Sequence, residues 1–223
     1  MTEAEWLECG DPDETLFQLA NRVNDRKLRC FVSACCRRIW YLFTNKVARK
    51  AVEALEQYAD GLTTREELER CHKAVNALYE GALKGRYKFR TSLNVFAVAT
   101  FASIGEFDFK DVLEVAAQTR YAVMDGGDVE VERAAQAALL RDICANPYRS
   151  LPKLEGRWLI WTSGTIGKLA CAIYDERAFD QLPILADALE EAGCTNADIL
   201  NHCRQPGEHV RGCWVIDLLL GKS

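Results

Sequence analysis

Apolar residues recur along most of this chain at spacings of three and four, the spacing of one face of an amphipathic helix. The clearest case is residues 28–42, where six apolar positions share one such face: Leu28, Phe31, Val32, Cys35, Ile39 and Leu42. This spacing predicts a long helix that buries Phe31, Cys35 and Ile39 together. The basic side chains of Arg37 and Lys46 should stay exposed.

The same periodicity appears in later segments. Further helices are predicted over residues 13–22, 93–103, 109–124, 129–145, 165–174 and 209–220. Two pairs of a hydroxyl and a carboxylate three residues apart, Thr2 with Glu5 and Thr64 with Glu67, form the capping-box pattern that begins a helix. No alternating strand pattern of convincing length occurs. The sequence therefore predicts an all-α protein, an irregular bundle of about ten helices.

One stretch interrupts this helical pattern. Residues 146–164 contain prolines, glycines and two tryptophans, and such residues break regular elements. We therefore expect an N-terminal helical bundle over 1–145 and a connector over 146–164. A smaller C-terminal helical subdomain, residues 165–223, should pack on the bundle.

Charge is unevenly distributed, although the overall composition, with 27% charged and 49% hydrophobic residues, is that of a globular protein. Residues 1–21 carry six acids and no base, whereas residues 26–50 carry eight bases and no acid. We interpret this as an acidic segment that lies near a basic helix and neutralises it. The alternative is a basic face for nucleic acid, phosphate or an acidic partner, formed by Arg37, Arg38, Lys46, Arg49 and Lys50. A pI near 5.4 argues against nucleic acid.

The cysteines and the first residues of the chain indicate in which cellular compartment the protein resides. The chain has ten cysteines and no C-x-x-C pair, and its first residues are acidic rather than those of a secretory signal. Reduced thiols are typical of the cytosol. No apolar run is long enough to cross a bilayer. We expect a cytoplasmic protein with no membrane partner.

Residues of the types that bind metal ions, cysteine and histidine, are closely spaced only near the C-terminus. The candidate ligands are Cys203, His209 and Cys213, with Cys194 or His202 as the fourth. On the predicted helix, His209 and Cys213 are four residues apart and share a face, and a turn at Pro206-Gly207 would fold Cys203 towards them. Zinc takes four such nitrogen or sulfur ligands. The spacing matches no standard zinc motif, so the opposing interpretation is buried core thiols and no cofactor.

Other chemistry finds little support. A cysteine nucleophile would need a nearby histidine, and Cys203 or Cys213 with His209 is the only plausible pair, without an oxyanion-hole signal. Residues 163–168 resemble a P-loop in composition but lack its glycine spacing. We assign no catalytic residue; the sequence favours a protein that is not an enzyme and leaves an enzyme of unrecognised type as an open alternative.

Several segments together resemble a family of small planctomycete bacterial proteins that carries no assigned activity. They are residues 5–7 (EWL), 25–29 (DRKLR), 35–40 (CCRRIW), 173–179 (IYDERAF), 182–189 (LPILADAL), 209–214 (HVRGCW) and 218–222 (LLLGK). The resemblance covers about half of the chain. It implies a bacterial cytoplasmic protein and brings no catalytic residues.

Abundant amphipathic helices without a convergent acid, base and nucleophile favour a non-enzymatic helical module that binds another protein. The two alternatives are a zinc protein that uses the C-terminal cysteines and histidines, and a nucleic-acid or phosphate binder that uses the basic face of residues 26–50.

Overall fold

The structure, a computed structural model, describes residues 1–20, 22–85, 90–104, 108–124 and 127–222. Within these ranges it contains thirteen α-helices, three short 3-10 segments and no strand. Helices account for 73% of the chain, which confirms the all-α prediction with somewhat more helices than the ten expected. No helix in the described ranges is long and apolar enough to cross a membrane.

The chain divides into two units, the first formed by residues 8–137 and the second by 1–7 together with 138–223. The boundary therefore lies inside one helix, α8 (Val129–Cys144), whose last turns belong to the second unit. The sequence predicts a division after residue 145 and a connector over 146–164, which stays a prediction. In the structure, residues 138–164 group with the C-terminal helices, and Trp158 in that range is buried in their apolar core.

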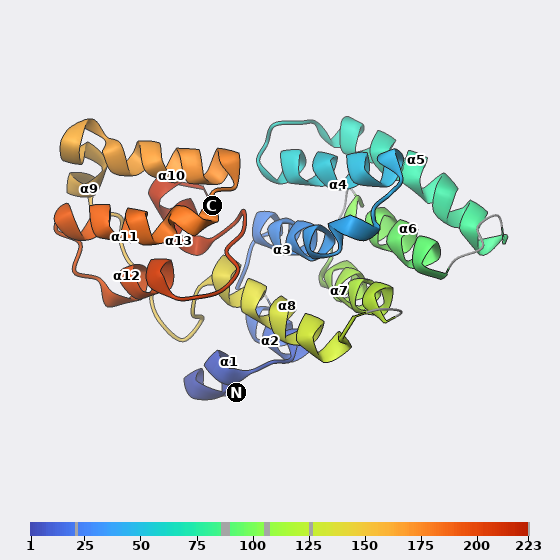
Figure 1. Cartoon of the computed structure of the whole chain (residues 1–223), viewed down its shortest axis with the longest axis horizontal. Helices are drawn as coiled ribbons and strands as arrows, with labels where there is room; N and C mark the ends of the chain where they lie inside the picture. Colours follow the sequence, from blue (N-terminus) through green and yellow to red (C-terminus); the bar gives the residue numbers. More distant parts are fainter. Residues whose placement is uncertain (21, 86–89, 105–107, 125–126, 223) are drawn as a thin grey trace. The chain divides into compact units, whose positions relative to one another are not determined.

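The first unit is built from helices of which α3 to α7 lie side by side in sequence order (Figure 1). They are α2 (Pro12–Leu19), α3 (Asp25–Arg38), α4 (Lys46–Ala59), α5 (Arg65–Leu83), α6 (Arg90–Ala102), α7 (Phe109–Val123) and the first part of α8. Each of α3 to α6 packs on the next, since short connections place consecutive helices side by side. Helix α3 also contacts α7, which closes the bundle.

Helix α3 contains the clearest apolar periodicity of the sequence, that of residues 28–42. Phe31, Cys35 and Ile39 are all buried, as predicted, and Lys46 is exposed. The prediction for Arg37 is wrong. Its guanidinium is only partly exposed because it pairs with the buried carboxylate of Glu56 on α4, at 2.6 Å. The helix also ends earlier than predicted, at Arg38, and a 3-10 turn follows.

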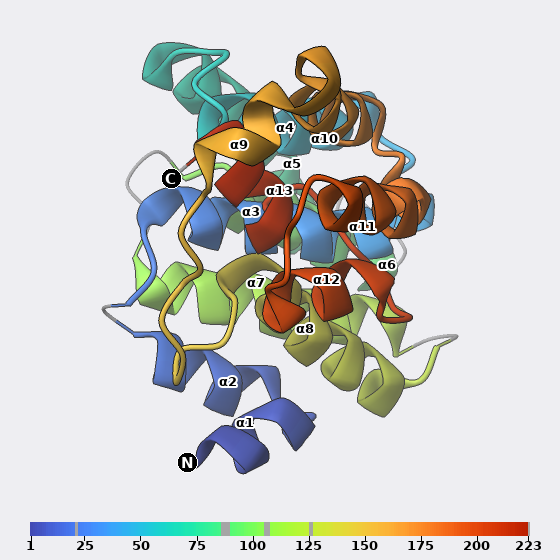
Figure 2. The same cartoon turned by 90° about the vertical axis from the view of Figure 1, so that its left-hand side faces the viewer.

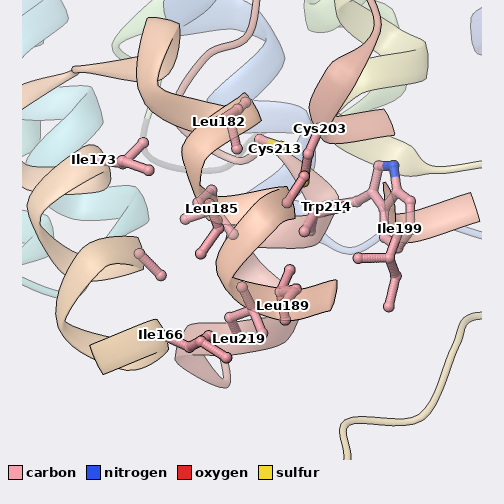
Figure 3. Packing of buried hydrophobic residues seen from close by; sticks show 14 of the residues in the cluster. Ile166, Ile173, Leu182, Leu185, Leu189, Ile199, Cys203, Cys213, Trp214 and Leu219 are labelled. Carbon is pink, nitrogen blue, oxygen red and sulfur yellow. The ribbon is translucent and has the colours of Figure 1, made fainter. Parts of the chain in front are cut away.

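The second unit contains α9 (Gly156–Ile160), α10 (Thr165–Glu176), α11 (Leu182–Glu191), α12 (Ala197–Arg204) and α13 (Trp214–Leu220). Helix α10 packs on α9, α11 and α13, and α11 packs on α12 (Figure 2). Its core is shown in Figure 3, where Ile173 of α10, Leu185 of α11 and Leu219 of α13 are among the buried side chains.

The N-terminal segment is attached to this second unit. Helix α1 (Glu3–Glu8) begins with the predicted capping box, in which the backbone nitrogens of Thr2 and Glu5 each donate to the other residue's side chain. Asn146 donates to Glu3 at 2.6 Å, and the Tyr148 hydroxyl donates to the carbonyl of Met1 at 2.6 Å. These bonds hold residues 1–7 against the chain that follows α8.

Candidate metal centre

Four side chains of the second unit converge: Asp142, His202, His209 and Cys213. Asp142 lies near the C-terminal end of α8, and His202 lies on α12. His209 and Cys213 come from the segment between α12 and α13. One ligand atom from each residue lies within 4.8 Å of all the others. Their nitrogen, sulfur and oxygen atoms are donor types that bind transition metals.

The segment that carries His209 and Cys213 is not helical, so the prediction of a helix from residue 209 is wrong for its first five residues. Helix α13 begins at Trp214. Gly207 and Gly212 have φ angles of 146° and 94°, and such positive angles interrupt a helix. A turn that is closed by Cys213 N donating to Val210 O, at 2.9 Å, then directs the thiol to the cluster.

Asp142 is the centre of the contacts. Its Oδ1 atom lies 2.6 Å from Nδ1 of His209 and 3.1 Å from Nε2 of His202. The same Nε2 atom lies 3.3 Å from Sγ of Cys213. In a tetrahedral zinc site with bonds of 2.0–2.3 Å, neighbouring ligand atoms are about 3.3–3.8 Å apart. The two distances from Asp142 Oδ1 to the imidazole nitrogens are shorter than this range, so these groups would have to separate by several tenths of an ångström to admit an ion.

A backbone contact fixes the carboxylate. Oδ2 of Asp142 accepts a hydrogen bond from the backbone nitrogen of Val210 at 3.0 Å. On the other side, Nδ1 of His202 lies 3.3 Å from the side-chain nitrogen of Gln205. An amide nitrogen donates, so Nδ1 accepts in the metal-free ring; to ligate a metal through Nε2, Nδ1 would have to carry the proton and the Gln205 amide would have to turn its oxygen towards it. Nε2 of His202 faces the cluster.

Burial, hydrogen bonds and neighbouring charges together set the pKa values of the metal-free cluster. Burial opposes ionisation of Asp142, but the hydrogen bonds from His202 and His209 outweigh it, and the pKa of Asp142 is lowered. Burial likewise disfavours the charged form of His209, yet the Asp142 carboxylate leaves its pKa raised. Burial and the Asp142 charge raise the pKa of Cys213 well above its usual range. A metal ion would therefore have to displace the thiol proton as it binds.

The structure unites part of the predicted ligand set. His209 and Cys213 belong to the cluster, and His202 belongs to it as the alternative fourth ligand. Cys194 and Cys203 do not belong to it; both lie in the apolar core, and burial raises the pKa of Cys203 to about 12. Cys203 follows His202 directly on α12, and successive residues point about 100° apart around a helix. Only one of the two can face the cluster.

Sequence reasoning missed Asp142, which lies sixty residues before His202. A signal for it was present, however. Asp142 comes three residues after Leu139 and one before Ile143, both fully buried, so a carboxylate falls on the apolar face of α8. A charge in such a position is almost always paired or bound to a metal.

The arrangement does not suit a cysteine nucleophile. In a nucleophilic triad, one ring nitrogen of the histidine faces the thiol and the other faces the carboxylate. Here Nε2 of His202 faces both Cys213 and Asp142, and Nδ1 faces Gln205. The Cys213 thiol is also fully buried. The geometry is that of donors around a common point.

Most residues of the predicted basic face form ion pairs or hydrogen bonds within the first unit. Arg37 binds Glu56, Arg38 binds Glu132 at 3.0 Å, and Lys50 binds Glu67 at 3.3 Å. Arg49 donates to the carbonyl of Phe43, and Lys46 is exposed. These contacts reduce the positive charge that the five residues would offer to a nucleic acid.

The neutralising acids are not the expected ones. Within the segment 1–21, Asp13 pairs with Arg120 at 3.0 Å and Asp11 pairs with Arg133 at 2.5 Å. The interpretation that this acidic segment covers the basic helix therefore needs correction. The arginines that pair with the acidic segment are Arg120 on α7 and Arg133 on α8, and α2 lies against α7.

Comparison with protein-family models, curated proteins and solved structures found no match to this chain.

Proposed function

We propose that this protein binds one zinc ion through Asp142, His202, His209 and Cys213. The observation that carries the proposal is the convergence of four ligand atoms, all within 4.8 Å, from residues that span 72 positions of the sequence. Three of the four side chains, those of Asp142, His202 and Cys213, are almost completely buried.

The donor set favours zinc over other common ions. Two imidazoles, one thiol and one carboxylate match the nitrogen, sulfur and oxygen ligands of Zn²⁺. Calcium and magnesium prefer oxygen ligands alone and six or more of them. A reducing cytoplasm, the location expected from the sequence, would keep Cys213 available as a thiolate ligand.

Metal analysis tests the proposal directly. The protein, purified without chelator and then supplied with excess ZnSO₄ before gel filtration, should retain about one zinc per chain. Cys213→Ser and His202→Ala should lose most of it. Cys194→Ser is the matched control, because Cys194 is an equally buried cysteine of the same unit that lies outside the cluster.

Two results would contradict a zinc site. One is a folded wild-type protein that retains no zinc after this treatment. The other is a loss of zinc in Cys194→Ser as large as that in Cys213→Ser, since the effect would then follow from disturbing the core. Circular dichroism on each variant separates metal loss from unfolding.

A protein partner is the second proposal, and large exposed apolar side chains of the first unit support it. Phe17, Tyr121, Met124 and Val131 are all more than half exposed, on or next to α2, α7 and α8. Affinity capture with wild-type protein and with a Phe17→Ser/Tyr121→Ser variant tests it. A protein recovered by the wild type alone would support this surface, and equal recovery by both would contradict it.

A further inference from the structure

A cavity of about 490 Å³ in the second unit adjoins the metal cluster. Three of the four proposed ligands, Asp142, His202 and His209, line it. Cys213 does not; it belongs to the apolar core. A metal ion held by the four residues would thus have its sulfur ligand on the core side and its nitrogen and oxygen ligands on the side of the cavity.

The walls of the cavity combine apolar surface with a few polar groups. Trp6, Trp214, Leu151 and Pro152 supply aromatic and aliphatic surface. The side chains of Arg141, Asn201 and Gln205 add hydrogen-bond donors. Sites for small organic molecules in proteins have this composition and volumes of about 300–1,000 Å³. A single inorganic ion would leave most of this volume unused.

Two donors on the cavity lining favour an anionic oxygen. Two carboxylates also line the cavity, that of Asp198, which pairs with Arg149 at 2.5 Å, and that of Glu208. Arg141 lines the cavity, and its Nη1 atom donates to the carbonyl of Trp6 at 3.3 Å, which helps to fix the guanidinium. Nε2 of His209 is buried and has no hydrogen-bond partner in the described part of the chain. With Nδ1 of that ring on a metal, Nε2 must carry a proton, and a shift of the ring that opens this buried atom to the cavity would let an entering oxygen accept that proton in a hydrogen bond.

We propose that the cavity holds a small organic carboxylate whose oxygen atoms approach the metal and Arg141, with its apolar part between the tryptophan and aliphatic walls. This inference rests on the proposed zinc site. A zinc ion with these four protein ligands would have to become five-coordinate to accept such an oxygen, as catalytic zinc centres sometimes do in the transition state. A carboxylate also matches the planar fork of an arginine.

Cobalt substitution tests the inference, because the visible bands of protein-bound Co²⁺ respond to a change in its ligands. The Co²⁺ protein is titrated with benzoate as the probe. We expect saturable changes in these bands, weaker changes with acetate, which lacks the apolar part, and none with benzyl alcohol, which lacks the carboxylate. Arg141→Gln should weaken benzoate binding about tenfold or more, the loss expected for a charged hydrogen bond.

A variant that fills the cavity gives an independent readout. Leu151 lines the cavity but is largely exposed, so Leu151→Trp should fold and bind Co²⁺ while losing the benzoate response. Ile184→Trp is the matched control, since Ile184 is similarly exposed on α11 and lies outside the cavity lining. It should respond to benzoate as the wild type does.

The outcomes separate the two proposals. Cobalt bands that benzoate leaves unchanged would overturn the carboxylate inference and leave the metal site intact. An equal benzoate response in Leu151→Trp and in the wild type would also overturn it. Absence of any cobalt bands from the folded wild type would overturn the metal site and, with it, this inference.

Discussion

Asp142 accepts hydrogen bonds from three groups that are distant in sequence: the ring nitrogens of His202 and His209 and the backbone nitrogen of Val210. Burying a carboxylate is costly unless such partners are present. The same contacts place both imidazoles at one oxygen atom. A single residue on α8 therefore positions both histidines of the cluster.

The Asp142–His209 pair predicts how the stability of the metal-free protein depends on pH. The pKa of His209 is raised from 6.5, so its contribution is complete below pH 6.5 and is lost as pH rises through the folded-state value. The pKa of Asp142 is lowered from 3.8, so its contribution is complete above pH 3.8 and is lost as pH falls through its folded-state value. The pair should stabilise the fold most between these ordinary values.

Urea unfolding with chelator present, measured from pH 5 to about pH 8, checks this expectation. The free energy of unfolding of the wild type should fall more steeply above about pH 6.5 than that of His209→Gln, which cannot be protonated. Parallel pH profiles for the two proteins would show that His209 does not gain a proton-dependent partner on folding.

Ile39 provides a second test at the scale of single residues. It is 1% exposed beside α3, and replacement by alanine removes packed methyl groups and leaves a cavity. We expect Ile39→Ala to lower the free energy of unfolding by about 2–5 kcal/mol. Lys46→Ala, at an exposed position, should change it by less than about 0.5 kcal/mol. Equal stability of both variants would mean that this face of α3 does not pack as described.

At the scale of elements, the segment between α12 and α13 matters most. Helix α12 ends at Arg204, and the chain then reverses direction before α13 begins at Trp214. The left-handed conformation of Gly212, with φ of 94°, lies within this reversal and directly precedes Cys213. The orientation of the thiol is thus set by a backbone conformation that residues with a side chain rarely adopt.

Substitution of this glycine should weaken metal binding without removing a ligand. Gly212→Ala adds strain of about 1–3 kcal/mol, part of which the chain would relieve by moving Cys213. We expect zinc affinity, measured by competition with a chromophoric chelator, to fall about tenfold. Gly156→Ala is the control, because Gly156 has an ordinary φ and open space around it. Unchanged affinity in Gly212→Ala would show that the turn does not position the thiol.

For the whole molecule, the division into two units predicts that a metal bound at the proposed site would act locally. All four ligands belong to the second unit, and none belongs to residues 8–137. A ligand that binds only the folded form stabilises the unit that binds it. The unfolding of this chain should accordingly not be a single two-state transition.

Hydrogen exchange with and without zinc measures this difference. Zinc should slow exchange in α12, in α13 and at the amide of Val210, which bonds to Asp142. Exchange in α4 and α5 of the first unit should stay the same. Equal protection of both units by zinc would contradict a purely local effect.

Local patterns determined much of this protein in advance. The all-helical class, the bounds of α7 and α8 to within about two residues and the buried face of α3 follow from the 3.6-residue period. Helix beginnings follow from short-range hydrogen bonds: the side chains of Thr64 and Asp108 accept from backbone nitrogens three residues on. Each of these features depends on neighbours within one or two turns, which a sequence displays directly.

Tertiary structure alone decided the composition of the cluster and the pairing of the charges. The sequence drew attention to His209 and Cys213 on the assumption of a helix, whereas a turn through Gly212 brings them together. Asp142 joins them from the end of another helix, and Arg37 is drawn to Glu56 across two helices. Such contacts depend on where the chain reverses and how helices pack, and neither is encoded in the periodicity of any one segment.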